Sequence, residues 1–206
     1  MSFCARGEAS TPQKAVESSD THSPPSLSTL SLIAQECLSE LTCPEKVHHK
    51  VVDTSAPDLS TPIAFASWHL YHQERTLEEV EADTVALHMF PEPNKPVATA
   101  FWARLAEMKK QIVGGRPHIL CENLGTHPEH HGKGAGSLLV KWAVEEGDRL
   151  GLEIYIEASE QGRGLYEKWG FEEVGSFVFD GSEWGINARE RISVGDPVCV
   201  GTMRSC

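Results

Sequence analysis

The sequence has 206 residues, of which 40% are hydrophobic, and a formal net charge of −12. This length suits one domain with a sizeable core. No run of about 18 apolar residues occurs, so we expect no membrane-spanning helix. The excess of acidic residues argues against binding along a nucleic-acid backbone and favours cationic partners such as amines or basic peptides.

The N-terminal residues lack the apolar stretch of a secretory signal, so we expect a cytoplasmic protein. The six cysteines are scattered without a CxxC pair, and we interpret them as free thiols. Residues 1–28 are rich in Ser, Thr, Pro and charge. Such a segment buries too little apolar surface to offset the entropy of ordering, so we expect a disordered arm.

Residues 30–41 place apolar side chains at helical spacing and predict a short helix that stops near Pro44. Residues 48–53 and 61–71 predict two strands of a hairpin, joined by the turn-rich segment TSAPDLSTP. An acidic, helix-compatible segment, residues 77–90, follows.

Residues 98–115 predict a longer helix. Its apolar face consists of Phe101, Leu105, Met108 and Ile112, at steps of four, three and four residues. We expect residues 77–115 to form a helical insertion before the next strand.

Residues 118–127 predict a strand, and residues 137–151 predict a helix after a glycine-rich loop. Residues 152–159 alternate, with one face consisting of Leu152, Ile154 and Ile156 and the other of Glu153, Tyr155 and Glu157. A short helix around residues 162–170, a strand in residues 171–180 and a last strand in residues 197–205 complete the pattern. The order of elements predicts one α/β domain over residues 29–206.

The loop HPEHHGKGAGSLL, residues 127–139, contains Gly132, Gly134 and Gly136 directly before a helix. Glycines let successive N–H groups point inward, and a helix N-terminus adds unpaired N–H groups and a positive dipole end. A P-loop would need Ser or Thr after Lys133, and the dinucleotide fingerprint would need glycine where Ser137 stands. The loop therefore predicts another kind of anion cradle, or else a plain tight turn.

The same loop holds His127, His130 and His131, with His118 near in sequence, and these imidazoles could surround zinc. The loop has no helical HExxH motif and no close cysteine. We therefore expect no metal, and interpret the histidines as loop residues with His131 beside the bound anion.

The run LGTHPEHHGKGAG, residues 124–136, resembles the acetyl-CoA-binding motif of the GNAT-type N-acetyltransferases. Downstream, LEIYIEAS and GRGLYEKWGFEEVGSF resemble that family's next strand, helix and strand. The likeness is clear over residues 117–179. It implies an α/β (α+β) fold with a central mixed, mostly antiparallel sheet flanked by helices.

The resemblance also implies an activity. Acetyl-CoA would be the cosubstrate, without a metal, and the acceptor would be a primary amine of a small molecule or peptide, attacking directly in a ternary complex. The oligomeric state would be a monomer or a homodimer, with no nucleic-acid or membrane partner. The alternative is a GNAT-fold protein that binds CoA or a partner without turnover, and a zinc-binding regulatory domain is a third hypothesis.

Residue by residue, the family's motif implies twelve cofactor-binding positions. They are Leu124, Gly125, Thr126, His131, Gly132, Lys133, Gly134, Ala135, Gly136, Ser137, Ser159 and Tyr166. His131 stands where the family has Gln or Arg, and Ser159 where many members have Asn. The family's usual N-terminal strand and two helices are not evident, and the helices between residues 77 and 112 are candidates to rebuild that half of the acceptor site.

Tyr166 occupies the family's general-acid position, since a phenol stays protonated at neutral pH. Glu122 is the candidate base, directly or through water, if residues 120, 122, 124 and 126 share one face of a regular strand. His118 is a second candidate base, and deprotonation without a dedicated residue also stays open.

Overall fold

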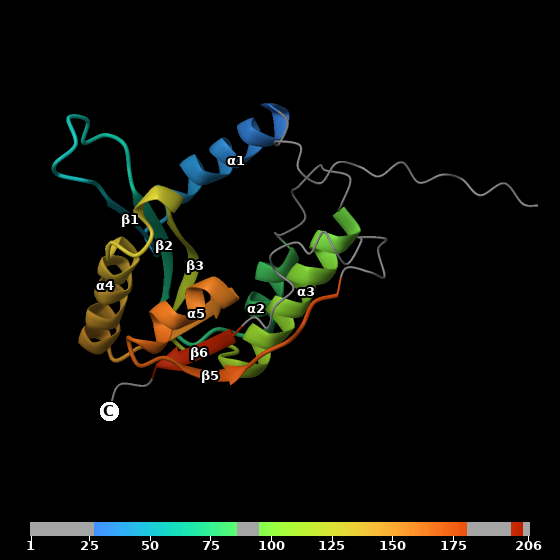
Figure 1. The fold of residues 1–206 in the computed structure, drawn as a ribbon. Helices are drawn as coiled ribbons and strands as arrows, with labels where there is room; N and C mark the ends of the chain where they lie inside the picture. The colour runs from blue at the N-terminus through green and yellow to red at the C-terminus, as the bar shows by residue number, and fades with distance from the viewer. Residues whose placement is uncertain (1–26, 86–94, 181–198, 204–206) are drawn as a thin grey trace, which may run out of the picture.

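A computed structural model describes residues 27–85, 95–180 and 199–203, and Figure 1 shows the fold. The expected arm therefore lies outside the described residues, apart from its last two positions, which begin a helix. In chain order the elements are α1 (Leu27–Glu40), β1 (Lys46–Val51), β2 (Ala64–Tyr71), α2 (Leu77–Val85), α3 (Lys95–Ile112), β3 (His118–Thr126), the 3-10 helix η1 (Pro128–His130), α4 (Ala135–Leu150), β4 (Glu153–Ala158), α5 (Glu160–Glu167), β5 (Glu172–Gly175) and β6 (Cys199–Met203).

The strands form one six-stranded sheet in the order β1-β2-β3-β4-β6-β5. β3 and β4 are parallel, whereas the other neighbouring pairs are antiparallel. A parallel pair needs a crossover connection, and α4 supplies it. The expected mixed, mostly antiparallel sheet flanked by helices is confirmed.

Two hydrophobic clusters cover the two faces of the sheet. One cluster packs α4 and α5 against the strands around Trp68, which is fully buried, and Trp142 and Trp169 pack against it partly buried. The other cluster packs α3 against Tyr71, Leu120 and Tyr155. Figure 1 shows α4 and α5 on one side and α2 and α3 on the other.

The alternating pattern of β4 explains how one strand serves both clusters. Ile154 and Ile156 lie in the α4 cluster, and Tyr155 lies in the α3 cluster. The predicted alternation is therefore confirmed.

α2 and α3 lie between two strands that are neighbours in the sheet. Tyr71, at the end of β2, is the pairing partner of His118, at the start of β3. The chain therefore leaves this pair of strands, forms two helices and returns to the same place. The predicted apolar face of α3 is confirmed, since Leu105 and Met108 are buried and Phe101 and Ile112 pack against the same cluster.

The helices α4 and α5 begin earlier than predicted, at positions set by their N-caps. α4 begins at Ala135, two residues early, because Gly134 takes a left-handed conformation at its N-cap. α5 begins at Glu160 because the Ser159 side chain accepts a hydrogen bond from the Gly162 N–H and caps the helix. None of the helices within the described ranges is long and apolar enough to cross a membrane.

Candidate active site

The central feature of the site is an opening between β3 and β4. These strands pair only from His118 to Leu120 on β3 and from Glu153 to Tyr155 on β4. β3 continues to Thr126, and its far half remains paired with β2 alone. Backbone groups of the strand end Leu124, Gly125 and Thr126 can therefore face the opening.

A β-bulge in β3 changes which side chains share a face. Cys121 pairs with Trp68 and Asn123 with Ser67, so Glu122 is the additional residue between the two pairs. Before the bulge, Leu120 points toward α3.

After the bulge the side chains point the other way. Leu124 and Thr126 point toward α4, since a Cβ on Gly136 would lie 3.9 and 3.5 Å from their side chains. The expectation that residues 120, 122, 124 and 126 share one face is wrong, because it assumed a regular strand.

The glycine loop leads onto an open helix N-terminus. Gly132 and Gly134 have φ angles of 73° and 89°, and a Cβ on either would meet nothing within 4 Å in the described structure. Gly134 is the N-cap of α4, and no side chain of the described residues caps it. The first N–H groups of α4 and its dipole thus face open space, which suits an anion.

Gly136 has a different role from the other two glycines. A Cβ there would lie 3.1 Å from the Leu165 side chain, so glycine allows α4 to pack closely against α5. Ala135 is buried at the same helix start, whereas Lys133 is exposed.

Besides Tyr166, which is described below, three of the predicted cofactor-binding side chains already have protein partners. His131 Nε2 lies 2.8 Å from the Thr126 carbonyl oxygen, to which it can donate a hydrogen bond. Trp169 Nε1 donates to the Ser137 hydroxyl over 3.2 Å. Ser159 caps α5, as described above. These side chains hold the loop and the two helices in place.

The loop histidines divide into two groups. His127 and His130 join Glu129 in a cluster whose candidate ligand atoms all lie within 4.8 Å of one another. His131 instead points back to Thr126, and His118 lies in the core. Any metal on this loop would thus use Glu129 in place of the third histidine that the sequence suggested. Two of the three members are exposed, and η1 is a surface turn.

Tyr166 lies in α5 with 9% of its surface exposed, and its hydroxyl is hydrogen-bonded to the Cys121 thiol on β3. Burial, together with Cys121, raises the pKa of Tyr166, so its phenol is protonated at neutral pH. Burial likewise raises the pKa of Cys121 to about 12, which keeps this thiol neutral. The structure therefore brings a proton-bearing phenol to the α4–α5 side of the opening.

Glu122 lies on the opposite, α3 side of the sheet. One of its carboxylate oxygens is 2.8 Å from Lys46 Nζ and 3.4 Å from His69 Nδ1. Burial disfavours the charged carboxylate, but the hydrogen bonds from His69 and Lys46 outweigh it and hold the pKa of Glu122 below its ordinary value. Glu122 is therefore ionised at neutral pH and is a weak proton acceptor.

His118, the second candidate base, lies at the paired end of β3 with 1% of its surface exposed. Its Nδ1 is 2.6 Å from the Arg116 carbonyl oxygen, and its ring packs between Tyr71 and Tyr155. Burial lowers the pKa of His118. Its surroundings are those of a core histidine.

Sequence reasoning missed Glu157 as a site residue. It lies on β4 beyond the last residue paired with β3, and its carboxylate accepts a hydrogen bond from the Tyr155 hydroxyl over 3.1 Å. Burial raises the pKa of Glu157, against the opposing effects of that hydrogen bond and of Lys109. The signal available in the sequence was the alternation that placed Glu157 on the same face as Tyr155.

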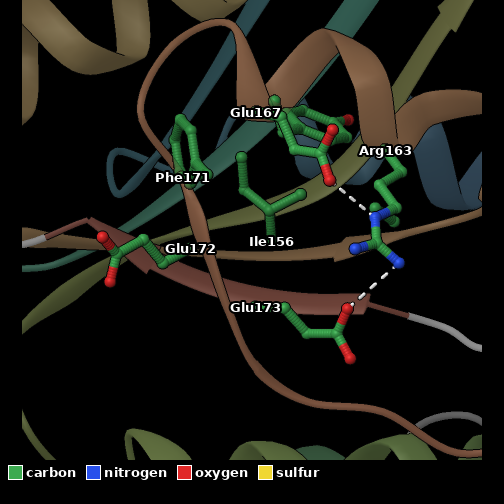
Figure 2. A pocket seen from close by; sticks show the side chains of 8 residues that line it. Ile156, Arg163, Glu167, Phe171, Glu172 and Glu173 are labelled. Carbon is green, nitrogen blue, oxygen red and sulfur yellow. Dashed lines mark hydrogen bonds and ion pairs between the residues drawn. The ribbon is translucent and has the colours of Figure 1, made fainter.

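Figure 2 shows a shallow pocket beside α5 that is lined from β4, α5 and residues 171–173. Arg163 crosses it, 2.7 Å from Glu167 and 3.2 Å from Glu173. The pocket shares Tyr166 with the opening, but three of its charged residues, Arg163, Glu167 and Glu173, form ion pairs with one another.

Comparison with known proteins relates the chain to acetyltransferases. Residues 92–173 match the family model of the acetyltransferase (GNAT) domain. The matched stretch includes the glycine loop, α4, β4 and α5, the same part of the chain that resembles the GNAT family. No curated protein sequence matches the chain significantly.

Solved structures of N-acetyltransferases share the fold. The mosquito arylalkylamine N-acetyltransferase like 5b is 17% identical, with a TM-score of 0.55, over 86% of this chain and 78% of that chain. Arylalkylamine N-acetyltransferase 2 from Aedes aegypti is 11% identical, with a TM-score of 0.57, over 84% and 79% of the two chains.

A bacterial structure is similar too. The histone acetyltransferase HPA2 and related acetyltransferase from Corynebacterium glutamicum is 14% identical, with a TM-score of 0.50, over 87% of this chain and 75% of that chain. At these low sequence identities, the structural similarity establishes a shared fold and nothing more.

Proposed function

We propose that the protein is an N-acetyltransferase that transfers the acetyl group of acetyl-CoA to a primary amine of a small molecule or peptide. The observation that carries the proposal is the opening between β3 and β4, which lies beside the uncapped N-terminus of α4 in a GNAT domain. Two structures that share the fold are named arylalkylamine N-acetyltransferases, which supports an amine acceptor.

The cradle fits the phosphates of acetyl-CoA. Gly132 and Gly134 leave open space where any other residue would place a Cβ, and the α4 N–H groups from Ala135 to Ser137 face an incoming anion. The strand end Leu124–Thr126 would hold the acetyl-pantetheine arm through its backbone. His131, Lys133 and Ser159 border this path.

The chemistry is direct attack in a ternary complex. The amine nitrogen forms a bond to the thioester carbonyl carbon, and the carbon–sulfur bond breaks. A backbone N–H of Leu124, Gly125 or Thr126 stabilises the charge on the carbonyl oxygen. Tyr166 gives its proton to the departing thiolate. Glu122, which stays ionised, is the carboxylate beside which the amine would bind, directly or through water.

The two groups lie on opposite sides of the sheet, which suits a ternary complex. Tyr166 and Cys121 belong to the α4–α5 side, where the cofactor would bind. Glu122 belongs to the α3 side, beside Lys46 and His69. A thioester in the opening would then meet its acid from one side and the amine from the other.

Thermal unfolding with and without saturating acetyl-CoA tests the proposal first. A ligand at a hundred times its Kd stabilises the folded state by about 2.7 kcal/mol, which is several degrees for a domain of this size. We expect a clear upward shift, followed by thiol release with at least one member of a primary-amine panel. A shift without thiol release would leave a CoA-binding protein without turnover, and the absence of any shift would overturn the assigned cradle.

A further inference from the structure

Two carboxylates flank the opening on the same face of the sheet. The last paired residues of the two parallel strands are Leu120 and Tyr155, and both side chains belong to the α3 cluster. Glu122 and Glu157 each follow two residues later. If the pairing continued in register, these two residues would be partners, so the strands part where a Glu stands on each.

Side-chain contacts confirm the shared face. Glu157 accepts its hydrogen bond from Tyr155, which is fully buried in the α3 cluster. Glu122 contacts His69, whose ring stacks on Tyr71 of the same cluster at a centroid distance of 4.0 Å. Both carboxylates therefore lie on the side of the sheet opposite Tyr166.

The surroundings of the two carboxylates differ. Glu122 has an ammonium group at 2.8 Å, since Lys46 bridges it to Glu40. Glu157 is held by a neutral phenol, and Lys109 of α3 acts on it through its charge. The charges of Glu157 and Glu122 both act on the Cys121 thiol of β3. Burial is outweighed at Glu122 by the hydrogen bonds from His69 and Lys46, which lower its pKa. At Glu157 burial prevails over Tyr155 and Lys109 and raises the pKa. Paired acids whose pKa values are pushed apart commonly have different roles in catalysis.

We propose that the two carboxylates divide the work of the acceptor side: Glu157 accepts the proton of the acceptor ammonium group, and Glu122 stays ionised as its counter-ion. Tyr155 is a positioning residue that holds the Glu157 carboxylate. This inference rests on the acetyl-transfer function proposed above.

The protons balance in this scheme. The ammonium nitrogen gives one proton to Glu157 and then attacks the thioester carbon as a neutral amine. After the carbon–nitrogen bond forms and the carbon–sulfur bond breaks, the nitrogen loses a second proton. This second proton restores the phenol of Tyr166, which has given its own proton to the sulfur. The proton taken up by Glu157 is therefore the one net proton that is released to solvent.

Substitution by glutamine separates the two roles. Glu157→Gln can still accept the Tyr155 hydrogen bond but cannot take a proton, so kcat should fall by about a hundredfold or more. The decrease of kcat at acid pH, which reflects protonation of Glu157, should be absent from the Glu157→Gln variant. Glu122→Gln keeps Glu157 and loses the counter-ion, so the KM for the amine should rise by about tenfold while kcat changes little. Glu145→Gln, an exposed position on α4, is the matched control and should change neither.

Tyr155→Phe tests the positioning role through a pH profile. The hydroxyl donates to the charged carboxylate and so lowers the pKa of Glu157. Its removal should move the acidic limb of the kcat profile to higher pH. A merely structural role would lower stability without moving that limb.

The substrates used would be acetyl-CoA with tryptamine, phenethylamine, butylamine and agmatine, and the carboxyls would also be titrated by ¹³C NMR. One glutamate signal should titrate above the ordinary range and be absent from Glu157→Gln. If Glu157→Gln keeps both kcat and the acidic limb, the inference is wrong, whereas the acetyl-transfer function stands. If the wild type shows neither an acetyl-CoA shift nor thiol release, the function itself fails.

Discussion

The two sides of the opening between β3 and β4 are assembled from different parts of the chain. The proposed cofactor side is built from consecutive residues: the end of β3, the glycine loop and the start of α4. The proposed acceptor side draws on distant segments: Lys46 of β1 and His69 of β2 contact Glu122 of β3, and Glu157 comes from β4. A short motif can thus specify an anion cradle, whereas a charged cluster of this kind exists only once the sheet has formed.

The largest expected effect is the loss of acetyl-CoA binding when only the proposed cofactor side is changed. Gly134→Val should abolish the acetyl-CoA-dependent shift in melting temperature, because the side chain fills the open space before α4 and strains a φ of 89°. Gly151→Val is the matched control, since Gly151 ends the same helix with a φ of 66° and open space at its Cβ. It should lower the melting temperature equally but keep the shift, and an intact shift in Gly134→Val would contradict the cradle.

The next effect concerns the proposed acid, Tyr166, which lies on the α4–α5 side of the sheet. Tyr166→Phe should lower kcat by about a hundredfold, because the thiolate loses its proton donor, while acetyl-CoA affinity changes little. Cys121→Ala removes the same hydrogen bond from its other end and keeps the phenol. Steady-state kinetics should show near-normal turnover in that control; a Tyr166→Phe variant as active as wild type would remove the acid role.

A stability effect of intermediate size concerns the acceptor side. Glu122→Gln should lower the free energy of unfolding by about 2 kcal/mol at pH 7, because Lys46 and His69 lose a half-buried ionic partner.

The pH dependence of that loss follows from the sign of the shift. The pKa of Glu122 is lowered in the folded protein, so its contribution is complete above the ordinary glutamate pKa of about 4.3 and is lost as the pH falls through the folded value. Urea unfolding at a series of pH values should show the wild-type advantage shrinking in acid. An advantage that is constant with pH would show that the ion pair is not its source.

The smallest effect compares two glycines in neighbouring helices, Gly164 of α5 and Gly136 of α4. Gly164→Ala in α5 should stabilise the fold by about 0.5–1 kcal/mol, because a Cβ there has open space and alanine favours helix. Gly136→Ala should gain nothing or lose about 1 kcal/mol, because its Cβ would press on Leu165 at 3.1 Å. Equal gains at both positions, measured by thermal unfolding, would show that the α4–α5 contact tolerates more than the structure indicates.

Residue patterns alone determined much of the fold. The apolar spacing along α3 and the alternation of β4 are local rules, and both predictions were confirmed. The glycines before α4 follow a local rule too, and the anion cradle that they indicate stays a prediction. The same patterns indicated the cradle and Tyr166, because the GNAT resemblance depends on a continuous run of residues.

Tertiary structure alone decided the rest. Glu122 was expected on a regular strand, but β3 forms a bulge where it pairs with β2. Local residue spacing does not predict how distant segments pair. Lys46 reaches Glu122 from β1, and burial between β4 and α3 changes the proton affinity of Glu157. The sequence shows that both residues are glutamates, but the charge of each carboxylate depends on neighbours that only folding brings close.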